Sequence, residues 1–247
     1  MESDSGKRFR PAIPTGDDRI AFRKSDSDKR PIGAATLDYS TGYCLTNIVN
    51  NEFCTERKLQ MAREYWKPSN LLYPVPAAII TTANKEGKTD MMTAAWVGTV
   101  CSDPVMVSVS VRPSRLTHDY IEETGVFVIN LTTRELAYAA DWVGVKSGRD
   151  VDKWKEMKLT PLPSKHIPAP GIQESPVCLE CLVRRKLELG SHDMYIAEVL
   201  STDVDASLLD EKGRLDLEKA DLIAYSHGTY YTLGEKLGTF GYSVKKS

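Results

Sequence analysis

Ser114 and Thr117 form a Ser-x-x-Thr pair at the expected start of a helix, directly after an alternating strand. Free backbone N–H groups and the positive end of the helix dipole make such a position suited to a phosphate. The flanking Arg112 and Arg115 add positive charge. The same pattern is typical of a plain cap, with Ser114 as the N-cap, which stabilises a helix by about 1 kcal/mol. The pair therefore predicts either a phosphate site or a cap.

A run of small residues precedes this pair and is expected on a strand. Small side chains would let a flat ligand lie close to the main chain and bind its N–H and C=O groups. A strand that simply packs on a helix explains the run equally well. The run is Thr93, Ala94, Ala95 and Trp96, with further hydroxyls at Thr99 and Ser102.

The polar stretch KSGRDVDK contains Ser147, Gly148 and Lys153 and is expected to be a surface loop. Its cations could close over an anion, but charged loops are more often only solvated. It remains a weaker candidate than the Ser-x-x-Thr pair.

His227, in SHGTYY, is a candidate for proton handling or for contact with a substrate. A histidine before a glycine is also typical of a turn. We interpret His118 as a surface residue and His192 as a turn residue. No histidine stands at a recognisable spacing from an acid or a nucleophile.

The five cysteines are spread along the chain and do not indicate a disulfide framework. Cys178 and Cys181 form a C-x-x-C, but the alternating pattern around them predicts a strand. Positions three apart on a strand point to opposite faces, so these thiols are not expected to share a metal or a disulfide.

Composition limits the function further. Of the 247 residues, 41% are hydrophobic and 27% charged, which is ordinary for a globular protein, and the net charge of −2 gives no reason to expect nucleic-acid binding. No apolar run approaches the roughly 20 residues that span a membrane. No secretion signal opens the chain, so we expect a cytoplasmic protein. Neither a Gly-x-Gly-x-x-Gly nor a Walker motif is present.

The elements that would position these residues are mainly short strands. Alternation and turn residues predict strands over 73–83, 89–100, 103–111 and 126–131, helices over 114–125 and 133–144, and a hairpin of 178–189 with 193–205. Many strands with two substantial helices indicate a small barrel with helices covering its ends.

Residues 1–60 are charge-mixed and show no sustained period, so we expect a disordered or non-native N-terminal extension before a domain over 61–247. Met61 lies just before the first regular pattern. We therefore hypothesise that Met61 is the true start of the protein.

Several segments together resemble the flavin reductase-like proteins of the flavoredoxin type. The resemblance runs from about residue 67 to the C-terminus, and its most distinctive parts are MTAAWVGTVCSDPVMVSVSVRPSRLTHDYI, GVKSGRDVDKW and KADLIAYSHGTYYTLGEKLGTFGYSV. It implies an FMN-binding split β-barrel, a mainly β, Greek-key-like antiparallel barrel with helices. It also implies a homodimer with the flavin near the subunit interface.

The resemblance also implies roles for the residues singled out above. The run of small residues would lie along the isoalloxazine, and the loop with Ser147, Gly148 and Lys153 would close near the flavin. An electron donor would approach near His227 and Tyr230. The phosphate would be held by Ser114, Arg115 and Thr117.

Two functions are consistent with this resemblance, and a flavin would supply the redox chemistry in both. One is an FMN-dependent oxidoreductase that passes electrons from NAD(P)H or a protein donor to flavin, a metal complex or a partner protein. The alternative is an FMN-binding electron carrier without its own NAD(P)H oxidation. A third interpretation is a structural barrel whose Ser-x-x-Thr is only a cap.

Overall fold

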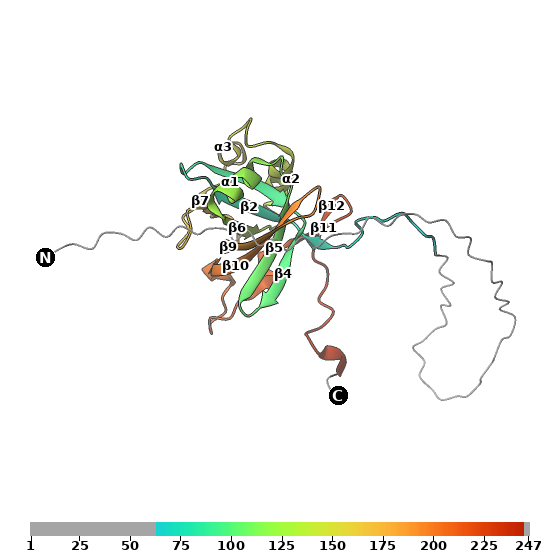
Figure 1. The fold of residues 1–247 in the computed structure, drawn as a ribbon. Coiled ribbons are helices and arrows are strands. Elements are labelled where there is room, and N and C mark those ends of the chain that lie inside the picture. The colour runs from blue at the N-terminus through green and yellow to red at the C-terminus, as the bar shows by residue number, and fades with distance from the viewer. Residues whose placement is uncertain (1–62, 245–247) are drawn as a thin grey trace, which may run out of the picture. The chain divides into compact units, whose positions relative to one another are not determined.

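The structure, a computed structural model, describes residues 63–244 and is built on one seven-stranded antiparallel sheet (Figure 1). The strand order is β3-β2-β6-β9-β10-β5-β4. Its strands are β2 (Ala78–Ala83), β3 (Thr89–Ala94), β4 (Val97–Ser102), β5 (Val105–Val111), β6 (Val126–Leu131), β9 (Val177–Glu188) and β10 (Asp193–Val204). Within residues 63–244 no ladder joins the edge strands β3 and β4, so the barrel is split.

Smaller elements complete the body. They are the three-stranded sheet β1 (Val75–Pro76), β11 (Ile223–Ser226) and β12 (Thr229–Thr232), the pair β7 (Pro161–Leu162) and β8 (Gly171–Ile172), the helices α1 (Leu116–Thr124), α2 (Ala137–Val145) and α3 (Lys153–Met157), and the 3-10 turns η1 (Ala206–Leu208), η2 (Leu217–Ala220) and η3 (Tyr242–Val244).

The expected extension over residues 1–60 and the hypothesis about Met61 lie outside the described residues. Residues 63–70 contain no helix or strand. Within the described part, no helix is both long enough and apolar enough to cross a membrane.

The sheet curls around one apolar core, which α1 also enters. Ile121 of α1 packs there with alternate residues of six strands, among them Ile80, Val109, Phe127 and Tyr195. Part of the other face is covered as well. There β2 and β3 pack on α2, and β2, β6 and β9 pack on the segment that contains Ile167. Every residue of β2 is therefore buried, because both faces of that strand are covered.

The strand predictions are largely confirmed. β5 buries Val107, Val109 and Val111 on one face. The predicted hairpin is the β9–β10 pair. Cys178 and Cys181 enter different apolar clusters on opposite faces of β9, as expected. Gly125 ends α1 in the left-handed conformation.

Three local predictions are wrong. The expected strand over 89–100 is broken at Ala95 and Trp96, because β3 ends opposite Ala78, where its partner β2 begins. The second helix begins at Ala137 and not at 133, where Thr133 forms an isolated bridge with Leu222. The N-cap of α1 is Arg115 rather than Ser114.

A turn displaces Ser114 from the cap position. Arg115 N donates to Arg112 O at 3.0 Å, which closes a turn with Pro113 at its second position. Proline is favoured there because its φ is already suitable. The helix consequently starts one residue later than the sequence predicts, and no side chain caps it.

Candidate functional site

A buried carboxylate joins three of the segments that the sequence singles out. Asp90 of β3 is only 4% exposed. The Thr117 hydroxyl on α1 donates to Asp90 Oδ2 at 2.8 Å, and Lys153 Nζ at the start of α3 lies 3.4 Å from Asp90 Oδ1. Such a buried charge is tolerated because a cation and a hydroxyl compensate for its lost hydration.

Gly148 belongs to the same arrangement because its backbone runs against Asp90. A Cβ at this position would lie 2.0 Å from Asp90 Oδ1. No side chain fits there, so the loop can close over the carboxylate only with glycine. Ser147 stands beside it, and its hydroxyl accepts from Arg149 N at 3.2 Å.

Lys153 is buried, which corrects the expectation of a solvated loop ending at this residue. Its ammonium also donates to Met91 O and, at 3.3 Å, to Val143 O, so it ties β3 to α2. Burial lowers the pKa of Lys153, and the charge of Asp90 opposes that shift. Asp152 fixes the position by capping α3, accepting from the backbone N–H groups of Trp154 and Lys155.

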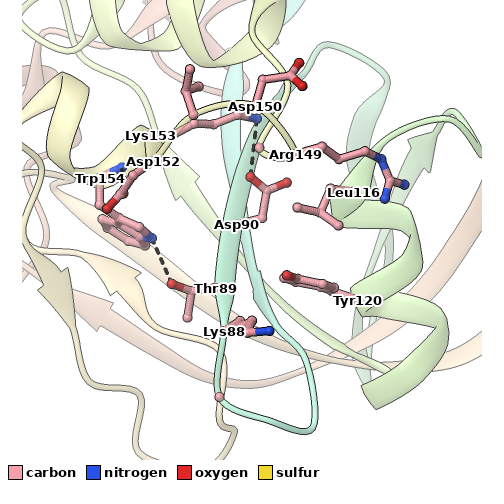
Figure 2. Close-up of a pocket in the computed structure, with 13 residues that line it drawn as sticks. Lys88, Thr89, Asp90, Leu116, Tyr120, Arg149, Asp150, Asp152, Lys153 and Trp154 are labelled. Carbon is pink, nitrogen blue, oxygen red and sulfur yellow. Dashed lines mark hydrogen bonds and ion pairs between the residues drawn. The ribbon is translucent and has the colours of Figure 1, made fainter.

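Beside this group lies a cavity of about 500 Å³ between the β2–β3 turn, α1 and the loop before α3. Figure 2 shows Tyr120 and Leu116 on one side of it and Trp154 on the other, with Asp90 at its centre. Trp154 Nε1 donates to the Thr89 hydroxyl at 2.9 Å, which fixes that wall.

The N-terminus of α1 is open. Ser114 is exposed, and no side chain accepts from the first N–H groups of the helix. Arg115 is half-buried, and its guanidinium donates to Gly144 O at 2.6 Å, close to the C-terminal end of α2. The Thr117 hydroxyl is instead turned inward to Asp90. Of the three residues predicted to hold the phosphate, Ser114 and Arg115 therefore lie at the surface, and Thr117 lies beneath it.

The run of small residues lies next to α2. Thr93 donates its hydroxyl to Ala140 O, and Gly144 approaches Thr93 so closely that a Cβ would lie 3.1 Å away. Ala94 ends β3, and Ala95 and Trp96 form a half-buried bend after it. Thr99 and Ser102 lie on β4, where both are exposed.

An aromatic cluster connects this bend to the β11–β12 hairpin. Tyr73 lies 6.0 Å, centroid to centroid, from both Trp96 and His227. His227 is exposed at the tip of the hairpin, with φ of 46°. Tyr230 is 5.4 Å from Tyr225 in the same cluster. His227 and Tyr230 therefore belong to the same aromatic cluster as Trp96 of the Ala95–Trp96 bend.

Tyr230 also anchors the hairpin to α2 through Asp141. Burial raises the pKa of Tyr230 to about 12, and the charge of Asp141 and its hydrogen bond with the phenol add to the shift. Tyr230 is therefore a neutral hydrogen-bond donor throughout the physiological range.

Sequence reasoning missed Asp90 and misplaced His118. An acid in the otherwise apolar run DMMTAA was the only signal for Asp90. His118 is buried rather than at the surface, and its Nε2 lies 2.8 Å from Asp193 Oδ2. The two residues lie 75 positions apart, so no sequence spacing marks this pair.

The surroundings of His118 do not favour a metal. Ligand atoms of His118, Glu122 and Asp193 lie within 4.8 Å of one another. However, Lys186 Nζ lies 3.2 Å from Glu122 Oε2 and 3.5 Å from Asp193 Oδ2. Because this ammonium already pairs with both carboxylates, we interpret the cluster as structural. Tyr195 completes it by donating to Glu122 at 2.6 Å.

Comparison with known proteins places these features in a family. The model of the flavin reductase like domain matches residues 70–234. An uncharacterized protein of Archaeoglobus fulgidus is 31% identical over 161 residues, which are 65% of this chain and 89% of that protein.

Two solved structures resemble the fold. Flavoredoxin of Desulfovibrio vulgaris (Miyazaki F) is 31% identical, with a TM-score of 0.69 over 74% of this chain and 100% of that one. An FMN-binding protein from Thermus thermophilus with bound 1-cyclohex-2-enone is 25% identical, with a TM-score of 0.62 over 72% and 99%.

Proposed function

The chain belongs to the flavin reductase-like family, and on that premise we propose that it is an FMN-binding oxidoreductase. The observation that carries the proposal is that α2 holds both an uncapped helix end and the end of β3, from which the chain enters the Ala95–Trp96 bend. Arg115 donates to Gly144 O at the end of α2, and Thr93 donates to Ala140 O in its middle.

The residues present fit FMN at both of its ends. The open N–H groups of α1, the exposed Ser114 hydroxyl and Arg115 suit a phosphate dianion. The bend lies outside the strand ladders. Trp96 O already accepts from Ser110 N at 2.9 Å, so a flat, polar-edged ring would bind the other backbone groups of the bend. The similar FMN-binding protein of Thermus thermophilus supports FMN as the cofactor.

The inward residues would position the site and would not touch the phosphate. Thr117 and Lys153 use their donors on Asp90, and Gly148 lets the loop close on it. We assign them the role of holding α1, β3 and the loop together, because each ties one of these segments to the carboxylate.

When bound, FMN would supply hydride acceptance and one-electron transfer. The chain would bind and orient it and leave one side open near His227 and Tyr230. The exposed imidazole of His227 can contact a donor or hold a proton there, and the neutral phenol of Tyr230 keeps the hairpin in place. We propose NAD(P)H or a redox protein as donor, and flavin, a metal complex or a partner protein as acceptor.

An FMN-binding electron carrier is the alternative. The similarity to a flavoredoxin supports it, because the name of that protein denotes a flavin redox carrier. We further propose that two copies form a homodimer with the flavin near their interface.

An anaerobic titration separates the two functions. The purified chain is mixed with FMN, then with NADH and NADPH in turn, while the visible spectrum is followed. Bleaching by either nucleotide identifies a reductase and its donor. Bound flavin that stays oxidised until dithionite is added identifies a carrier. Failure to bind flavin at all contradicts the proposal.

The same assay tests His227. We expect His227→Asn to slow bleaching at least about tenfold with FMN affinity unchanged. Asparagine is chosen because it tolerates the positive φ of this position better than alanine does. An unchanged rate would leave His227 as a turn residue.

A further inference from the structure

Two basic side chains face each other at the end of the β5–β10 pair. Asp193 begins β10 and is paired with Val111, the last residue of β5. In an antiparallel pair this register puts His192 opposite Arg112, and the Cβ atoms of opposite residues lie about 5 Å apart. Like charges in opposite positions destabilise a sheet. The pair is therefore favourable only if the histidine is neutral or if an anion lies between the two side chains.

No acid in the described part of the chain forms an ion pair with Arg112 or His192. The acids on either side of the β9–β10 turn have other partners. Asp193 Oδ2 lies 2.8 Å from His118 Nε2, and Glu188 Oε1 lies 3.4 Å from the ammonium of the lysine two positions before it. Arg112 is exposed, so its guanidinium is accessible to a ligand from solvent.

The imidazole of His192 is oriented by its own turn. Leu189 N donates to His192 O at 3.0 Å, which closes the turn, and Ser191 Oγ lies 2.9 Å from His192 Nδ1. This contact engages Nδ1 and leaves Nε2 for a ligand. Burial and the charge of Arg112 lower the pKa of His192 from its ordinary value of 6.5. The ring is therefore neutral at neutral pH when no anion is bound.

The pair stands between the two parts of the proposed flavin site. Arg115 N donates to Arg112 O at 3.0 Å, so Arg112 begins the turn that leads into the open end of α1. In the other direction, Ser110 N donates to Trp96 O at 2.9 Å, so the Ala95–Trp96 bend lies beside a residue two positions before Arg112. Two residues of a strand span about 7 Å. A group bound by Arg112 is thus close to both parts.

We propose that Arg112 and His192 form a phosphate site, with the phosphate held between the two side chains. His192 takes up a proton when the phosphate binds, because an anion in contact favours the imidazolium. The phosphate belongs either to FMN or to a nicotinamide dinucleotide, which carry the same chemical group. The choice of these two sources rests on the proposed function, whereas the site itself can be tested with inorganic phosphate alone.

A phosphate suits the pair better than a carboxylate does. A phosphate monoester carries a charge of about −2 near neutral pH and so balances both cations, whereas one carboxylate would leave a positive charge uncompensated. Its oxygens also accept from both side chains at once, through charge-assisted hydrogen bonds. Because the ring is neutral in the free chain, the affinity for phosphate should rise as the pH falls and His192 becomes easier to protonate.

NMR of the histidine rings tests the site directly. Inorganic phosphate is added to the full-length chain, and the titration of each imidazole with pH is compared with that in sodium chloride of equal ionic strength. We expect phosphate to raise the pKa of His192 by at least about one unit. The exposed His166 is the internal control and should titrate alike in both salts. His192→Gln identifies the signal, and Arg112→Gln should reduce the shift.

Calorimetric titration in two buffers of different ionisation enthalpy distinguishes the sources, because it reports both affinity and proton uptake. If the site holds the phosphate of FMN, His192→Gln should weaken FMN binding about tenfold, remove the proton uptake and leave riboflavin binding unchanged. If it holds a dinucleotide, the same losses should appear with ADP-ribose, which has the pyrophosphate but no nicotinamide. His166→Gln is the matched control for each ligand.

The inference is overturned if phosphate leaves the titration of His192 unchanged. It is also overturned if folded His192→Gln and Arg112→Gln bind FMN and ADP-ribose as the parent chain does, with the same proton uptake. Thermal unfolding shows whether each variant is folded. A parent chain that binds no FMN, but whose His192 responds to phosphate, would contradict the proposed function and leave the phosphate site standing.

Discussion

At the scale of the residue, Gly148 determines whether the loop before α3 can close on Asp90. Its Cα stands where a Cβ would lie 2.0 Å from the carboxylate. We expect Gly148→Ala to lower the free energy of unfolding by about 2–3 kcal/mol, because the loop or the carboxylate must move. Urea unfolding measures it. Gly98→Ala is the control, since a Cβ there meets nothing within 4 Å, and equal losses would refute the close approach.

Ser114 and Thr117 are only three positions apart, yet we expect opposite effects from replacing them. Thr117→Val removes a buried hydrogen bond to Asp90 and should lower the free energy of unfolding by about 1–3 kcal/mol. Ser114→Ala should leave stability unchanged and weaken FMN binding about tenfold, since its hydroxyl is exposed. Thermal unfolding and FMN titration on both variants measure these changes. The reverse pattern would show that Thr117 faces the ligand.

Single residues also show where sequence reasoning stops. The residues of the run Thr93–Trp96, of the loop at Gly148 and of the helix at Arg115 could be singled out because each stands in a local pattern. Asp90 and His118 could not, because their partners lie 27 and 75 positions away in the sequence. Alternation tells which side of a strand a residue takes, but it does not tell which distant group will meet it there.

At the scale of elements, β5, β6 and the β9–β10 hairpin were predictable because burial of alternate or of all residues leaves a strong pattern. The residues at which elements begin and end were less predictable. The break after β3 depends on where β2 begins, and the start of α1 depends on the turn at Pro113. The break after β3 is set by strand pairing, and the start of α1 is set by turn geometry. Neither can be read from the local sequence pattern.

The contact between α2 and β12 gives a prediction about pH. Burial and Asp141 raise the pKa of Tyr230 to about 12, above the ordinary value of 10. An acid that stays protonated longer in the folded state loses its stabilising effect as the pH rises, here between about 10 and 12. Absorbance at 295 nm should show Asp141→Asn titrating this phenol closer to pH 10. Tyr230→Phe should remove that late step. An identical curve for Asp141→Asn would show that burial alone sets the shift.

At the scale of the whole molecule, FMN should stabilise the fold if it binds the open end of α1 and the Ala95–Trp96 bend as proposed. A ligand at 100 times its Kd adds about 2.7 kcal/mol to the free energy of unfolding, provided that it binds only the folded chain. For a domain of this size that corresponds to a rise in Tm of roughly 5–10 °C. Calorimetry with FMN measures the rise.

Riboflavin is the matched ligand, because it keeps the ring and lacks the phosphate. If the open end of α1 holds the phosphate, riboflavin at the same concentration should raise Tm by clearly less than FMN does. Arg115→Gln should then lower the FMN effect toward that of riboflavin, because the variant lacks the guanidinium charge. Equal shifts from the two ligands would place the binding energy in the ring alone, and α1 would then only help to fill the barrel.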